Sequence, residues 1–206
     1  MEIVQILLKP LAFLSMKHAV LNKIRWGIPF VMSFLSIIIA IFLPIKPYFF
    51  GINGLIPAVT GLLQILTGFF IASLAAVATF DKKDMDEIML GTPPTMVKTV
   101  DGKKTNDPLT RRRFLCYLFG YLSLLSLFLY FAGSLSPFVS DNVKALMPNK
   151  AFLITRYLSL SLYLFLVYQL LTITLLGLYY MAHKIHCNDN IDAIPTAIDS
   201  VEEGEE

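Results

Sequence analysis

The chain has 206 residues, of which 56% are apolar and only 16% are charged, and its mean hydropathy is +0.66. A soluble domain of this length needs more polar residues to cover its surface, so the composition excludes that class and predicts an all-α integral membrane protein. The net charge of +2 is unevenly distributed along the chain. Residues 188–206 carry only acidic charges, so the rest of the chain has a net charge of about +9.

Residues 1–26 are predicted to form an amphipathic helix that lies in the cytoplasmic membrane interface. The apolar run 3–8 is short and is interrupted by Lys9 and Pro10, which argues against a signal peptide. Beyond it, apolar residues recur at the spacing of one helix face: Leu11, Leu14, Leu21 and Ile24.

A bundle of four membrane-spanning helices is predicted within residues 27–182. A helix needs about 20 mostly apolar residues to cross about 30 Å of hydrocarbon. Backbone groups cannot remain unpaired in lipid, so apolar spans of this kind are expected to be helices. Four stretches qualify, and they cover about residues 27–45, 55–80, 114–138 and 157–182.

The distribution of Lys and Arg predicts the orientation of the spans. Four crossings place both termini on the same side as residues 81–113, the insert between the second and third spans. That side carries 13 basic residues, against four on the other side. Because short cytoplasmic flanks hold the excess of basic residues, we expect both termini and the insert in the cytoplasm.

The second span carries a face of small residues, made of Gly61, Gly68, Ala72 and Ala76. Small residues at helical spacing let two helices approach closely in lipid. The face therefore predicts the interface of a homo-oligomer or a pore-facing helix. Packing within a single four-helix bundle explains the same pattern equally well.

Polar side chains inside the spans are a second group of candidates. They are Thr60, Gln64 and Thr67 on the second span, and Gln169 and Thr172 on the fourth. A buried amide in hydrocarbon is costly unless it finds a hydrogen-bond partner. Gln64 and Gln169 are therefore the strongest intramembrane candidates, although hydrogen bonds that only join the helices of a bundle are a common alternative.

The sequence contains no catalytic constellation. It has no Ser/His/Asp set, no paired carboxylates in a cavity-forming context and no Gly-rich phosphate loop. His183, His186 and Cys187 cluster where the fourth span ends, but no convincing further ligands stand beside them. We therefore expect no enzymatic activity, no metal site and no cofactor.

The insert 81–113 is predicted to contain three structural elements. The helix of the second span is expected to continue for a turn or two, until Gly91 and the two prolines that follow it. Asp101-Gly102 then favours the turn of a small β-hairpin. Three consecutive basic residues begin the third span and are expected to bind anionic headgroups: Arg111, Arg112 and Arg113.

The hairpin and the acidic tail, residues 183–206, are the expected docking sites for a cytosolic protein partner. A hairpin is only marginally stable alone, so it must pack on its own bundle, a neighbouring copy or another protein. The candidate residues are Lys98, Asp101, Gly102, Lys103 and Lys104 in the hairpin, and Ile191, Ile194 and Ile198 in the tail. A disordered, solubilising tail is the alternative. Direct nucleic-acid binding is not expected, because six acids share the insert and no aromatic residue stands among its basic groups.

Two segments that flank the hairpin carry a resemblance to a known family. These are LAAVATFDKKDMDEIMLGTPP, residues 74–94, and LTRRRFLCYLFGY, residues 109–121. With the four-span plan, they resemble the membrane subunits of bacterial anti-phage systems, most closely the four-helix membrane protein of the Kiwa system. The resemblance implies a homo-oligomer in the bacterial inner membrane that senses infection and recruits a cytosolic, nucleic-acid-binding partner. The alternative function is an oligomeric pore that depolarises the membrane.

Overall fold

A computed structural model describes residues 9–16, 19–42, 49, 54–79, 85–88, 94–100, 103–146 and 148–184. Within these residues, four helices are long and apolar enough to cross a membrane. The spans are Lys23–Ala40, Leu55–Thr79, Arg111–Val139 and Lys150–Ala182. The sequence prediction of a mostly helical, four-span chain with a small two-stranded sheet is therefore confirmed.

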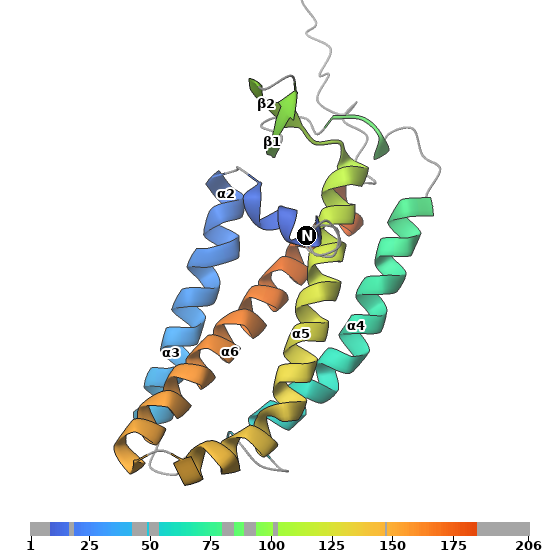
Figure 1. Ribbon diagram of the computed structural model, residues 1–206. Helices are drawn as coiled ribbons and strands as arrows, with labels where there is room; N and C mark the ends of the chain where they lie inside the picture. The colour runs from blue at the N-terminus through green and yellow to red at the C-terminus, as the bar shows by residue number, and fades with distance from the viewer. Residues whose placement is uncertain are drawn as a thin grey trace, which may run out of the picture.

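The four long helices form a layer in the order α3, α6, α5 and α4 (Figure 1). They are α3 (Ile28–Phe42), α4 (Leu55–Thr79), α5 (Arg111–Leu146) and α6 (Asn149–Tyr179). Two hydrogen bonds join α3 to α6: the Ser33 hydroxyl donates to the Ser161 carbonyl at 3.1 Å, and the Ser36 and Tyr168 hydroxyls lie 2.7 Å apart. The consecutive spans α3 and α4 thus lie at opposite edges.

The edge helices remain largely uncovered. In an apolar 18-residue window of each span, 17% of the α3 residues and 22% of the α4 residues are buried, against 56% for α5 and 44% for α6. Large apolar side chains such as Phe34 and Ile65 are 61% and 72% exposed. An exposed apolar surface of this extent agrees with a chain surrounded by lipid.

The N-terminal segment differs from the single amphipathic helix that the sequence predicts. It consists of the 3-10 helix η1 (Lys9–Ser15), the short α2 (Ala19–Asn22) and the π-helical turn η2 (Lys23–Gly27). Phe13 and Met16 are fully buried, whereas Leu11, expected on the apolar face, is 36% exposed. A 3-10 helix has three residues per turn, so a face assigned by α-helical spacing is displaced.

The main apolar core extends from the end of the layer that carries the hairpin, here called the hairpin end, to Leu63 of α4 and Leu129 of α5. Phe13 of η1 packs there against α5, with its ring centroid 5.4 Å from that of Tyr121 and 6.3 Å from that of Phe114. The N-terminal segment is therefore part of the core at this end.

Helix α5 extends beyond the predicted end of the third span, which was placed near residue 138. The helix continues through Pro137 to Leu146. Pro137 has no N–H to donate to the carbonyl of Gly133, one turn earlier. The hydroxyl of Ser136 donates to that carbonyl at 2.8 Å instead, so the helix persists although Figure 1 shows it bending near this end. Helix α6 likewise begins at Asn149, before the predicted start at 157.

The predicted hairpin is present as β1 (Thr95–Val100) and β2 (Lys103–Pro108), paired antiparallel. Val100 pairs with Lys103, which leaves two residues for the turn, as the sequence predicts. Asp101 and Gly102 themselves lie outside the described residues. The predicted projection of the α4 helix is wrong for residues 85–88, where Ile88 forms an antiparallel bridge with Thr110.

Gly133 allows the closest contact between three helices, and its replacement tests this packing. A Cβ at position 133 would lie 2.9 Å from the Tyr163 Oη and closer still to the Thr60 Oγ1. We expect Gly133→Ala to lower the free energy of unfolding by about 1–3 kcal/mol, the usual cost of overpacking. SDS titration of the protein in mild detergent, followed by circular dichroism, measures this change.

Gly120→Ala is the matched control on the same helix. A Cβ there meets only the Pro10 Cβ, at an ordinary 3.7 Å. It should leave stability unchanged or raise it by roughly 0.5–1 kcal/mol, because Ala is the better helix former. Equal effects of the two substitutions would contradict the three-helix contact at Gly133.

Candidate functional site

A buried polar network joins the N-terminal segment to α5 and α6 at the hairpin end. Arg25 of η2 is only 4% exposed. Its guanidinium donates to the Phe13 carbonyl at 2.9 Å and to the side-chain oxygen of Asn22. The Gln169 amide donates to the Arg25 carbonyl at 3.2 Å and accepts from the Tyr121 hydroxyl at 2.9 Å.

This network gives Gln169 a structural role. Its side chain is 1% exposed, and both its nitrogen and its oxygen are hydrogen bonded within the chain. Neither Arg25 nor Tyr121 was among the candidate residues predicted from the sequence. The spacing of Asn22 and Arg25 was the available signal, because residues three apart on a helix face the same side.

The polar residues predicted on α4 do not act as one group. Thr60 and Thr67 are buried. Both donate to carbonyls of their own helix, at 2.8 and 2.7 Å, and the Thr67 Oγ1 also lies 2.9 Å from the Ser126 Oγ of α5. Gln64 is exposed instead. On α6, the Thr172 hydroxyl faces the Tyr168 and Gln169 carbonyls of its own helix at 2.9 and 3.1 Å.

The small-residue face of α4 points away from the rest of the chain. Gly61, Gly68 and Ala72 are exposed, and Ala76 is half-buried. A Cβ added at either glycine would meet nothing within 4 Å. Packing within one bundle therefore does not explain these small residues. Gln64 lies beside them, and no residue in the described part of the chain gives it a hydrogen bond.

Two of the three arginines at the start of α5 hold neighbouring residues of the insert in place. Arg112 forms two hydrogen bonds with the Asp86 carboxylate, at 2.7 and 3.0 Å. Arg113 reaches Asp107 of β2 at 3.1 Å. The backbone N–H of Arg111 donates to the Glu87 carbonyl at 3.2 Å. These contacts add a structural role to the headgroup contact that the sequence predicts, which stays a prediction.

The predicted docking residues are described only in part. The backbones of Lys98, Lys103 and Lys104 lie in the two strands, at positions paired with Thr105, Val100 and Thr99. The other docking candidates lie outside the described residues, and they are Asp101, Gly102, Ile191, Ile194 and Ile198. His186 and Cys187 of the terminal cluster also lie outside them.

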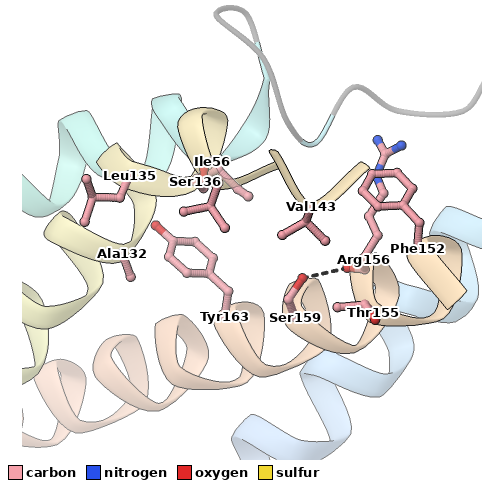
Figure 2. A pocket seen from close by; sticks show the side chains of 11 residues that line it. Ile56, Ala132, Leu135, Ser136, Val143, Phe152, Thr155, Arg156, Ser159 and Tyr163 are labelled. Atoms are coloured by element: carbon pink, nitrogen blue, oxygen red, sulfur yellow. Dashed lines mark hydrogen bonds between the residues drawn. The ribbon is translucent and has the colours of Figure 1, made fainter. Parts of the chain in front are cut away.

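A pocket of about 380 Å³ opens at the end of the layer opposite the hairpin. It lies between the first turn of α4, the last part of α5 and the first part of α6. Figure 2 shows Tyr163 at one end of this pocket, and Phe152 and Arg156 at the other. No sequence pattern predicts this pocket, because its walls come from three segments far apart in the chain.

Comparison with known proteins finds no matching family model, and no curated protein or solved structure with significant similarity.

Gln169→Leu tests the polar network. It removes the hydrogen bonds of this side chain to the Tyr121 hydroxyl and the Arg25 carbonyl. We expect the free energy of unfolding in detergent to fall by about 1–2 kcal/mol. Hydrogen exchange should also become faster at residues 9–16, since the backbone of Arg25 is held less firmly.

Thr172→Val is the control on the same helix. The Thr172 hydroxyl reaches only carbonyls of its own helix, so its loss should change stability by less than about 0.5 kcal/mol. A similar loss of stability in both variants would show that the network contributes no more than an ordinary hydroxyl group.

Proposed function

We propose that the chain is a multi-pass inner-membrane subunit that self-associates through α4 and presents its hairpin to a cytosolic effector protein. The observation that carries the proposal is the position of Gln64. Its amide lies on an uncovered face of a membrane-spanning helix, beside Gly61, Gly68 and Ala72.

The physics of lipid makes a second copy a suitable partner for this face. An amide in hydrocarbon is unfavourable without hydrogen bonds. A Gln64 amide from another copy offers both a donor and an acceptor. The small residues beside it allow the two backbones to approach closely enough for that contact. In a symmetric homodimer the same surface of each copy meets its equivalent, so Gln64 of one copy can face Gln64 of the other.

The positive-inside distribution supports a cytoplasmic position for the hairpin end. The strands are connected to the core through Leu109, which is fully buried, and through Met96, which packs partly buried against it. A two-stranded sheet of this size has backbone edges that can pair with another strand. We propose that the hairpin, together with the acidic tail, docks the partner.

The resemblance to the Kiwa membrane protein supports a role in anti-phage defence. In that role the chain senses infection at the envelope, and any contact with nucleic acid belongs to the cytosolic partner. The composition of the insert supports this division, because its basic residues are interspersed with acids.

Gly68→Ile tests self-association. The side chain of isoleucine would keep two α4 helices apart, so we expect the mass of the complex in mild detergent to fall toward that of one chain. Because position 68 is open within the chain, the fold itself should be unaffected. Ala151→Ile, at an exposed position of α6, is the control and should leave the mass unchanged.

Joint replacement of Lys98, Lys103 and Lys104 by Ala tests docking. We expect this variant to lose the effector that co-purifies with the native chain, and to keep the oligomeric mass. Lys9→Ala with Lys150→Ala, at exposed positions outside the hairpin, is the charge control. Full retention of the effector by the triple variant would count against hairpin docking.

An oligomeric pore is the second candidate function, and the exposure of Gln64 is the observation that favours it. Thr60 and Thr67 lie in the contact with α5, so such a pore would be lined by Gln64 and its small neighbours. Ion flux through liposomes separates the two functions. A pore requires flux from the native chain and a changed flux for Gln64→Leu, whereas a scaffold produces none.

A further inference from the structure

The pocket between α4, α5 and α6 has the construction of a lipid-binding site. Its volume of about 380 Å³ falls in the range of about 300–1,000 Å³ that is typical of ligand pockets. Leu135 and Val139 of its α5 wall are 56% and 55% exposed, so the pocket opens sideways onto the surface that faces the bilayer.

Two hydroxyl groups of the lining donate to carbonyls of their own helices. The Ser136 Oγ donates to the Gly133 carbonyl at 2.8 Å, and the Ser159 Oγ donates to the Arg156 carbonyl at 3.0 Å. The lining is mainly apolar, and a buried water needs two to four polar partners. An empty apolar space loses dispersion contacts along its whole lining, so a hydrocarbon chain is the favoured filling.

The pocket lies at the membrane depth of a lipid phosphate and the first part of its acyl chains. The α6 span has 33 residues and is about 50 Å long at about 1.5 Å per residue, against about 30 Å of hydrocarbon. With the hydrocarbon centred on this span, Arg156 lies at its edge, where phosphates lie. Tyr163 lies about 10 Å deeper, because seven residues separate the two along the helix.

Arg156 gives the site a preference for lipids with a negatively charged headgroup. Figure 2 shows its guanidinium directed away from Tyr163, at the opposite end of the pocket. A guanidinium carries five N–H groups and forms bidentate contacts with phosphate, so a phosphate can be added to the contacts it already has. The exposed Lys150 lies on the same helix nearer its start and adds positive charge.

We propose that this pocket binds one anionic phospholipid, with an acyl chain between α5 and α6 and its phosphate on Arg156. The ring of Tyr163 closes the inner end of the acyl-chain site, with its buried Oη near Gly133 and Thr60. The site requires that the chain lies in a bilayer, but it does not depend on self-association or on a partner.

Native mass spectrometry of the full chain tests the site. The protein is delipidated in mild detergent and titrated with phosphatidylglycerol or phosphatidylcholine. We expect one tightly bound phosphatidylglycerol per native chain. Arg156→Gln should lose about tenfold in affinity for phosphatidylglycerol and less for phosphatidylcholine, because the choline group of phosphatidylcholine already offsets the charge of its phosphate. Lys150→Gln is the charge control and should have the smaller effect.

Ala132→Phe and Ser159→Phe fill the pocket from opposite walls and should each weaken both lipids by tenfold or more. Ile154→Phe adds the same ring at a position that is 69% exposed and outside the lining, and it should bind as the native chain does. Undiminished binding by both filled variants overturns the proposal. It is equally overturned if Arg156→Gln retains the preference for phosphatidylglycerol, or if filling the pocket lowers the oligomeric mass without changing lipid binding.

Discussion

The side-chain amide of Gln169 joins parts of the chain that are far apart in sequence. In hydrocarbon a polar group must be hydrogen bonded, and Gln169 meets this requirement with Tyr121 of α5 and the backbone of Arg25. Arg25 in turn holds the Phe13 carbonyl. The burial of the N-terminal segment against α5 thus depends on a set of contacts that begins inside the fourth span.

The same requirement has the opposite result at Gln64. This residue lies exposed on the helix at the edge of the layer, where the described residues give it no hydrogen bond. The two glutamines are equivalent in sequence, because each is an isolated amide in an apolar span. The order of the helices buries one glutamine within the chain and leaves the other exposed.

The sequence was sufficient to predict the four spans and the hairpin, because length, hydropathy and a two-residue turn signal are local properties. It was insufficient for the ends of helices. The Ser136 hydroxyl replaces the hydrogen bond that Pro137 cannot make, and spacing does not reveal such a substitution. It was also insufficient for the neighbours of each helix. Helical spacing grouped Thr60 with Gln64, but the buried face of α4 ends between them. The pocket was missed because no single segment contains it.

The position of α3 has a consequence for biogenesis. Its hydrogen-bonded partners in α6 follow 128 and 132 residues later in the chain. A ribosome therefore delivers α3 to the membrane long before α6 exists, and α4 and α5 can pair with each other during that interval. The first span therefore lacks its α6 partners, in lipid or in the insertion machinery, until the last span is inserted. Contacts of this long range are slow to form, so completion of the layer is expected only after translation of the fourth span.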